Sequence, residues 1–318
     1  MKRFVTNCIL FFVLFFILEK SLIFLRNRLP DRELDKRLEY IITGKINADI
    51  IVMGSSRGAR GIVASQLADS LYTTAYNLSY PGSNVYFHEY LLKELLKNGN
   101  KKPKLLILAV DDPYEMLKNY SLQFRFDCLY PLVKYKSIRN TLIEQGEKNR
   151  ILSELFIIHQ LSISNFDPRK DKFTYLDTLL NDGSMTISWQ SPRFNRSFAT
   201  ENVVYNRNKE EQSKIESFTN IIQMCRNNKI AVLLAFAPNF GKPTIGFKQR
   251  MEELAGNNSY VMQYDTTNPV YRDADYYTDV AHLKLNGATV FTTEIATFIK
   301  LNKILERWQQ TTIVPFSR

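Results

Sequence analysis

Three residues that lie far apart in the sequence have the side chains of a serine nucleophile, its general base and the acid that orients the base. Gly54-Ser55-Ser56 directly follows a short apolar run, and Asp279 and His282 lie more than two hundred residues later in one segment. A serine hydroxyl becomes a good nucleophile when an imidazole takes its proton and a carboxylate holds that imidazole in the correct tautomer. The chain has only three histidines, and His282 alone has a carboxylate three residues before it. These residues predict acyl transfer through an acyl-serine intermediate.

Each of these residues also has a simpler structural explanation. Ser56 could cap the N-terminus of a helix, Asp279 could cap the last helix, and His282 could be an ordinary packed surface residue. The glycine spacing Gly54-x-x-x-Gly58-x-x-Gly61 invites a phosphate-loop interpretation. It lacks the Lys and Ser/Thr of a Walker loop, however, and does not match the dinucleotide fingerprint, so nucleotide binding is not favoured.

Short apolar runs alternate with helical patterns along the chain. The expected strands are residues 49–53, 75–78, 105–110, 230–236 and 260–264. The expected helices are residues 60–70, 85–97, 210–227, 245–254 and 287–308. Strands that are apolar throughout and alternate with helices are typical of a parallel sheet covered on both faces. The sequence therefore predicts an α/β fold, a flavodoxin-like three-layer sandwich, with Ser56, Gly82 and Asp111 all beyond the carboxyl ends of strands.

Together these motifs resemble the SGNH (GDSL-like) hydrolase family. The motifs are Gly54-Ser55-Ser56 after the first strand, Asn77 to Gly82 after the second, and Asp279-x-x-His282-Leu283 followed by Asn286-Gly287-Ala288. The resemblance covers residues 48–112 and 229–305, about half of the chain. It implies that Ser56 is the nucleophile, that His282 and Asp279 complete a catalytic triad, and that Gly82 lends a backbone N–H to the oxyanion hole.

Two positions depart from the family pattern. Ser55 replaces the usual aspartate of the first block, and Asp111-Asp112 stand where the family has an asparagine after the third strand. The missing asparagine removes one oxyanion donor. The side chain of Asn84 could take its place as a donor, and Asp111 could replace it only if protonated.

The Gly-Ser-Ser form of the first block is similar to that of membrane-anchored relatives that handle acyl groups on cell-envelope polymers, including D-alanyl transfer proteins and polysaccharide O-acetyltransferases. The resemblance therefore implies a serine esterase or O-acyltransferase that acts on acyl (acetyl) esters of envelope polysaccharide, without a cofactor. A membrane partner could donate the acyl groups. The alternative is a catalytically weak or inactive envelope protein of the same fold, which serves as a polymer-binding or assembly module.

The N-terminus carries an apolar run from Phe4 to Leu25 that two charged residues interrupt. At about 1.5 Å per residue the run reaches roughly 33 Å, enough for a hydrocarbon core of about 30 Å. A cleaved signal peptide is the alternative, but no small-residue cleavage site follows the run. We expect residues 1–30 to form a single-pass membrane anchor and residues 45–308 to form an extracytoplasmic domain, in the periplasm or cell envelope.

Residues 113–208 interrupt the alternation of strands and helices. An insertion after the third strand would stand over the active-site face, where it could form a cap or lid. Its aromatic and basic side chains could stack on sugar rings or hold acidic groups, or they could be the insertion's own core and rim. The residues in question are Phe124, Arg125, Phe126, Tyr130, Trp189 and Arg193.

Composition argues against several other classes of protein. The net charge is +10, but the 42 Lys and Arg residues are scattered among 32 acids without a nucleic-acid motif, so we expect no nucleic-acid partner. No Cys or His cluster has the spacing of a metal site. Cys8 lies in the apolar run, and Cys128 and Cys225 are either one disulfide or two buried thiols. No role is assigned to His88 or His159.

Overall fold

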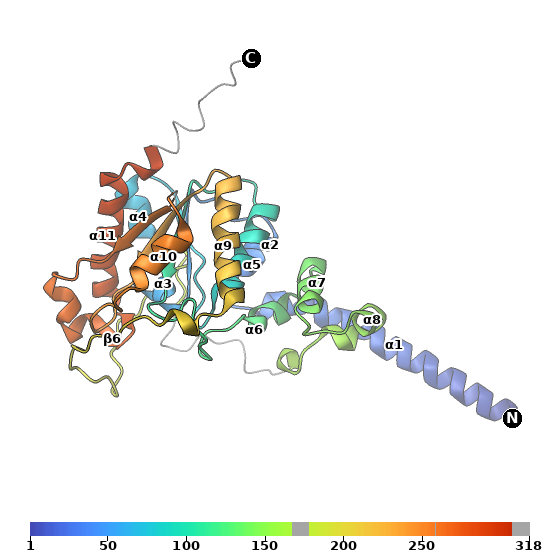
Figure 1. Ribbon diagram of the computed structural model, residues 1–318. Coiled ribbons are helices and arrows are strands. Elements are labelled where there is room, and N and C mark those ends of the chain that lie inside the picture. Colours follow the sequence, from blue (N-terminus) through green and yellow to red (C-terminus); the bar gives the residue numbers. More distant parts are fainter. Residues whose placement is uncertain (167–177, 258, 307–318) are drawn as a thin grey trace, which may run out of the picture. The chain divides into compact units, whose positions relative to one another are not determined.

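The computed structural model describes residues 1–166, 178–257 and 259–306, which form two compact units (Figure 1). The first unit contains the described residues of Met1–Glu39 and Arg125–Phe173. The second contains those of Tyr40–Phe124 and Thr174–Arg318. The region expected as an insertion, residues 113–208, is therefore shared between the two units. Residues 167–177 of that region, and the end of the last expected helix at residue 308, lie outside the described residues.

The second unit is built on a five-stranded parallel sheet. The strands lie in the order β2-β1-β3-β4-β5, and every neighbouring pair is parallel. This is the order of flavodoxin-like sheets, and the predicted α/β fold is confirmed. The strands are β1 (Ile50–Gly54), β2 (Ala75–Asn77), β3 (Leu105–Val110), β4 (Ala231–Phe236) and β5 (Ser259–Gln263).

Helices cover both faces of this sheet, as Figure 1 shows for α4 and α11 on one side and α5 and α9 on the other. On the first face α11 packs against α3 and α4, and on the second face α9 packs against α5 and α10. The first set is α3 (Ser56–Gly61), α4 (Ala64–Leu71) and α11 (Leu285–Leu301). The second set is α5 (Val85–Asn98), α9 (Gln212–Asn227) and α10 (Phe247–Ala255).

The core of the second unit follows from the apolar strands. β1 and β3 are buried along their whole length. Ile50, Val52 and Ile107 belong to one buried cluster with Phe291 and Ile295 of α11. Because successive strand residues point to opposite faces, the residues between them face α5 and α9. Each such buried side chain contributes about 1.5–3 kcal/mol relative to leaving it exposed, so the central strands are held rigidly.

One expected helix, residues 60–70, is divided in two in the structure. α3 begins four residues earlier than expected and ends at Gly61, and α4 begins at Ala64. The N–H of Val63 donates to Oγ1 of Thr292 at 3.0 Å instead of to a helical carbonyl. The prediction of a single helix was wrong because this tertiary hydrogen bond replaces a helical one.

The first unit is helical. Its long element is α1 (Lys2–Arg32), and among the described residues this is the one helix long and apolar enough to cross a membrane, a test that a signal sequence would also pass. The shorter helices are α6 (Phe126–Leu129), α7 (Lys136–Glu144) and α8 (Arg150–Leu155). The 3₁₀ turns are η1 (Tyr130–Leu132), η2 (Ile157–Gln160) and η3 (Ile163–Phe166). α2 (Arg37–Ile42) runs from the first unit into the second.

The three cysteines are free thiols in the structure. Cys225 is buried in α9, where burial raises its thiol pKa to about 12. Burial likewise raises the pKa of Cys128 above its ordinary range. Of the two alternatives left open by the sequence, the structure has free thiols rather than a disulfide.

Candidate active site

Ser56 occupies the turn between β1 and α3. Ser55 is the N-cap of α3, and its side chain accepts a hydrogen bond from the N–H of Arg57. The capping role that could have explained Ser56 is therefore filled by its neighbour. As the first residue of α3, Ser56 also keeps a backbone N–H without an intrahelical acceptor.

Two glycines let this turn lie close to β3. A Cβ on Gly54 would lie 2.8 Å from the carbonyl oxygen of Ala109, and one on Gly58 would lie 2.5 Å from Oγ of Ser79 and 2.9 Å from Cβ of Ala109. A larger residue at either place would push α3 away from the sheet. The glycines therefore fix the position of Ser56 relative to β3.

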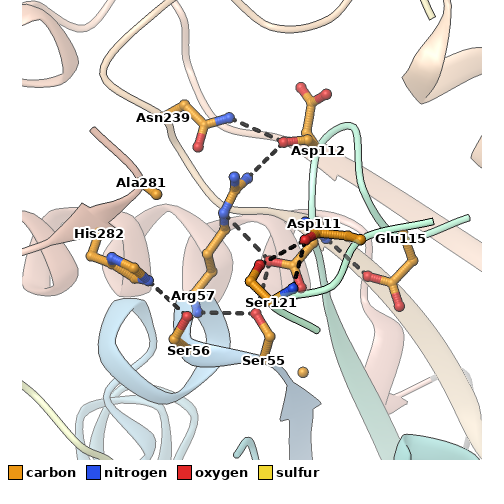
Figure 2. A network of polar contacts seen from close by, with 12 residues as sticks. Ser55, Ser56, Arg57, Asp111, Asp112, Glu115, Ser121, Asn239, Ala281 and His282 are labelled. Atoms are coloured by element: carbon orange, nitrogen blue, oxygen red, sulfur yellow. Dashed lines mark hydrogen bonds and ion pairs between the residues drawn. The ribbon is translucent and has the colours of Figure 1, made fainter. Parts of the chain in front are cut away.

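His282 and Asp279 lie on a small two-stranded antiparallel ribbon, β6 (Tyr277–Asp279) and β7 (His282–Leu283). Nε2 of His282 lies 2.7 Å from Oγ of Ser56. Figure 2 marks this contact between the two side chains with a dashed line. Nδ1 of His282 lies 2.8 Å and 2.9 Å from the two carboxylate oxygens of Asp279. Because an ionised carboxylate only accepts hydrogen bonds, Nδ1 donates to Asp279, and in the neutral ring this leaves Nε2 as the acceptor that faces the serine.

The environment of Asp279 keeps its carboxylate ionised. Burial opposes ionisation, but hydrogen bonds from His282 and from the N–H of Ala281 outweigh it and hold the pKa of Asp279 below its ordinary value. The N–H of Ala281 donates to Oδ1 of Asp279 at 2.8 Å. A negative charge at this place stabilises the imidazolium that forms when His282 takes a proton.

Part of the region expected as an insertion supports this ribbon. The carbonyl of Trp189 accepts from Oγ1 of Thr278 at 2.8 Å, and the carbonyl of Thr278 accepts from the N–H of Ser191 at 2.8 Å. The amide of Gln190 donates to the carbonyl of Tyr277 at 3.0 Å. These bonds hold residues 189–191 beside the strand that carries Asp279.

A buried charged cluster lies on the other side of the serine turn, at the end of β3 (Figure 2). Oγ of Ser55 donates to Oδ1 of Asp111 at 2.8 Å, and Nε of Arg57 lies 3.4 Å from the same oxygen. The guanidinium of Arg57 also donates to the carbonyl of Asp112 at 3.0 Å. Burial raises the pKa of Asp111, and Arg57 and Ser55 partly offset this effect.

Glu115 and His88 extend this cluster below the surface. Oε2 of Glu115 accepts from the N–H of Asp111 at 3.0 Å. Burial and the nearby Asp111 carboxylate raise the pKa of Glu115 to about 8. Nε2 of His88 lies 2.9 Å from Oγ of Ser83, and burial lowers the pKa of His88 to about 3, so its ring is neutral. Nothing in the sequence identified these two residues, because a buried polar pair is set by tertiary contacts.

The other expected site residues lie in the loop before α5. Gly82 has a φ of +74°, and its carbonyl accepts from the N–H of Gln123 at 2.9 Å. Asn84 is the N-cap of α5: its Oδ1 accepts from the N–H of Phe87, and its Nδ2 donates to the carbonyl of Leu122 at 3.5 Å. The structure thus gives the Asn84 side chain a capping role.

The aromatic and basic residues of the expected lid have several different surroundings. Phe124 packs edge-on against Phe87 at 5.2 Å, which favours internal packing. Arg125 pairs with Asp127 at 2.6 Å, and Tyr130 donates to Glu147 at 2.8 Å, both within the first unit. In the second unit Trp189 is half-buried, and Arg193 is exposed. Phe126 begins α6.

The described residues contain no group of three or more His, Cys, Asp or Glu side chains placed to hold a metal ion. A hollow in the second unit is lined by Lys104, Lys300 and Lys303, among others. Lys104 precedes β3, so this hollow lies at the amino ends of the strands, opposite the edge that carries Ser56. Ser56 follows β1 and Asp111 follows β3, the point at which the strand order reverses and where such sheets bind ligands.

Comparison with known proteins adds little to this geometry. No family model and no curated protein matches the sequence. Among solved structures, the chain is similar to a protein from Bacteroides fragilis described as a "putative acylhydrolase". The two are 11% identical, the match covers 86% of this chain and 98% of that one, and the TM-score is 0.40. Conclusions about function must therefore come from the site itself.

Proposed function

We propose that the protein is a membrane-anchored serine esterase or O-acyltransferase that works through an acyl-serine intermediate. The observation that carries this proposal is the unbroken chain of hydrogen bonds from Ser56 Oγ to His282 Nε2 and from His282 Nδ1 to Asp279. A packed surface histidine and a capping aspartate would not need to meet a serine at the first residue of a helix. The resemblance of the surrounding motifs to SGNH hydrolases supports the same activity.

In the proposed reaction, Oγ of Ser56 attacks the carbonyl carbon of an ester while Nε2 of His282 takes the hydroxyl proton. The ester C–O bond breaks, and His282 returns that proton to the leaving alcohol. Asp279 stays ionised and stabilises the imidazolium throughout. Water or a second hydroxyl then attacks the acyl-serine, with His282 again as the base, and the ester product or free acid leaves Ser56 regenerated.

The oxyanion of the tetrahedral intermediate needs donors aimed at it. The backbone N–H groups of Ser56 and Gly82 are the proposed donors, because neither forms a backbone hydrogen bond among the described residues. Asn84 is a weaker candidate than the sequence suggested, since its amide is already bound to Leu122. Asp111 is a negative charge unless protonated, Ser55 already donates to it, and Arg57 forms an ion pair with it at 3.4 Å.

The proposed substrate is an acyl (acetyl) ester of a cell-envelope polysaccharide, and a membrane protein that supplies acyl groups is the proposed partner. The support is α1, which can hold the domain at a membrane surface, together with the resemblance of Gly54-Ser55-Ser56 to the same block in anchored envelope relatives. We place the second unit outside the cytoplasm for the same reason.

Labelling with a fluorophosphonate probe tests the nucleophile. The full-length protein should be labelled, Ser56→Ala should not be, and Ser65→Ala, which removes an exposed hydroxyl on α4, should be labelled like the parent chain. Labelling of Ser56→Ala at the parent level would refute the assignment. Release of acetate from an acetylated polysaccharide, with and without a sugar acceptor, then separates hydrolysis from transfer.

A second candidate function is favoured by one observation, the carboxylate of Asp111 at the place where the family has an amide donor. A charge there would oppose an oxyanion, and the fold would then serve as a polymer-binding or assembly module. Absence of probe labelling and of acetyl release, together with retention of the protein on immobilised envelope polysaccharide, would support this alternative.

A further inference from the structure

The first unit carries exposed apolar side chains outside α1 as well as along it. Five of them follow one another in α8 and the two turns after it. Leu155 is 57% exposed and Ile163 is 91% exposed. The full set is Ile151, Leu155, Ile158, Ile163 and Phe166. We call residues 150–166 the interfacial segment.

The interfacial segment packs against α1. The ring of Phe156 lies 6.3 Å from that of Phe15 in an edge-on contact. Nζ of Lys20 donates to the carbonyl of Leu155 at 3.3 Å, and Arg26 donates to the side chain of Gln160 at 2.8 Å. These contacts fix the segment beside the part of α1 that runs from about Phe15 to Arg26.

The segment also covers a charge that a spanning helix would otherwise expose to lipid. Glu19 is buried, and one of its carboxylate oxygens accepts from the N–H of Ile157. Its other oxygen lies 2.9 Å from Nζ of Lys20. An ionised group inside the hydrocarbon region is costly unless it is paired, so the segment removes that cost at this level of the helix.

The length of α1 that the first unit leaves uncovered shows how far along the helix Glu19 and the interfacial segment lie. Apart from Phe24, the apolar residues of α1 that the unit leaves exposed run from Phe4 to Leu18. At about 1.5 Å per residue they cover roughly 22 Å, whereas the hydrocarbon core is about 30 Å thick. Beyond Leu18 the helix is flanked by the interfacial segment, so a bilayer that α1 spans must meet that segment too.

From these observations we infer that residues 150–166 form a second membrane-binding surface, seated in the boundary between headgroups and acyl chains of the same bilayer that α1 crosses. This inference rests on the proposed anchor. The partner of these apolar side chains is lipid, because they continue the apolar surface of α1, the proposed anchor. Segments of this kind bury their apolar face about 5–10 Å into the boundary.

The test uses the full chain in vesicles of phosphatidylcholine and phosphatidylglycerol, with a polarity-sensitive fluorophore on single cysteines. Cys8→Ala and Cys128→Ala remove the two partly exposed thiols, and Cys225 stays because its thiol is buried. Probes are then placed by Leu155→Cys and Ile163→Cys. Spin labels near the headgroup end, or at the tail end, of the lipid acyl chain report the depth of each probe by quenching.

Two further positions serve as references. Leu10→Cys lies in the bare part of α1 and should be quenched most by the tail-end label. Tyr72→Cys is an exposed site in the second unit and should remain unquenched. The probes at 155 and 163 should show blue-shifted emission and stronger quenching by the headgroup-end label than by the tail-end label.

The outcomes distinguish a failure of the interfacial segment to bind lipid from a failure of the proposed anchor. Without quenching at Leu10, the anchor itself fails and the inference fails with it. With quenching at Leu10 but none at 155 or 163, the anchor stands and the interfacial segment does not bind lipid. A blue shift at 155 and 163 without quenching by either label would mean that protein covers the segment, and equal quenching at Tyr72 would mean unspecific adsorption; either result overturns the inference.

Discussion

Replacing Glu115 by glutamine should stabilise the folded protein at neutral and alkaline pH. The carboxyl group of Glu115 is buried and accepts a hydrogen bond from the N–H of Asp111 at 3.0 Å. Burial and the Asp111 carboxylate raise its pKa to about 8, so the folded protein holds this group neutral at pH 7. A glutamine keeps the accepting oxygen and stays neutral at every pH, and its amide can face Nδ1 of His88, which lies 3.8 Å from the carboxylate in the structure.

The sign and size of the effect follow from proton linkage. The unfolded chain loses the Glu115 proton near pH 4.5, whereas the folded state keeps it up to about pH 8. Between these values the folded state binds more protons, so the free energy of unfolding falls as pH rises through the window and stays low above it. At about 1.4 kcal/mol per pH unit, the loss is on the order of 5 kcal/mol for the buried group. Glu115→Gln removes this loss, and its advantage should be greatest above pH 8.

Urea unfolding of the full chain in detergent measures this difference. The chain has two tryptophans, so a Trp308→Phe background leaves Trp189 as the single reporter in the second unit. Unfolding midpoints are compared at pH values below, inside and above the window, with Glu216→Gln, an exposed carboxylate on α9, as the matched control. A Glu115→Gln midpoint that never exceeds that of the control, or that falls at alkaline pH, would show that Glu115 is charged in the folded state and refute the reasoning.

Three further predictions concern the site and the anchor. Asp279→Asn should lower turnover of a small acetyl ester by about 10³- to 10⁴-fold, because the tautomer of His282 is no longer fixed, and an unchanged kcat would contradict the triad. Arg57→Met should destabilise the fold by about 3–5 kcal/mol, because it leaves the buried Asp111 unpaired, and addition of Asp111→Asn should recover much of that loss in a double-mutant cycle of urea midpoints. The full chain should stay in the membrane pellet through high-salt and carbonate washes, whereas removal of residues 1–30 should release it; recovery of the intact chain in the supernatant would contradict the anchor.

The fold was predictable where a buried strand is apolar along its whole length. β3 and β4 have that form, and the predicted and observed strands agree within one residue at each end. The sequence was less informative where tertiary hydrogen bonds decide the backbone. The break between α3 and α4 depends on Oγ1 of Thr292, more than two hundred residues away, and no local pattern contains that information.

The pairing of residues 125–166 with α1 was also not predictable. The contacts that join them, such as Phe15 with Phe156 and Glu19 with Ile157, link residues well over one hundred positions apart. The pattern of strands and helices predicted an insertion over residues 113–208, because contacts over such separations leave no local signal in the sequence. The sequence did contain the apolar residues that are exposed in the structure. Their spacing, however, has no helical or strand period that would indicate what they contact.

For the site, the sequence was sufficient to choose the residues that the structure brings together. Asp279 and His282 are three residues apart in one segment and Ser56 lies in the turn after β1, and in the structure His282 lies 2.8 Å from Asp279 and 2.7 Å from Ser56. The residues that support the triad could not be predicted from the sequence. Arg57 stands beside Ser56 in the sequence, but only the fold shows that it points to Asp111 and to the carbonyl of Asp112.

Ser55 and Asp111 are the two positions at which the sequence departs from the SGNH pattern that its motifs resemble, and their side chains contact each other in the structure. The Ser55 hydroxyl donates to the Asp111 carboxylate at 2.8 Å. Arg57 places a positive charge 3.4 Å from the same carboxylate. Because that pairing reduces the negative field at Ser56, a carboxylate in this position is compatible with an oxyanion held by the backbone N–H groups of Ser56 and Gly82.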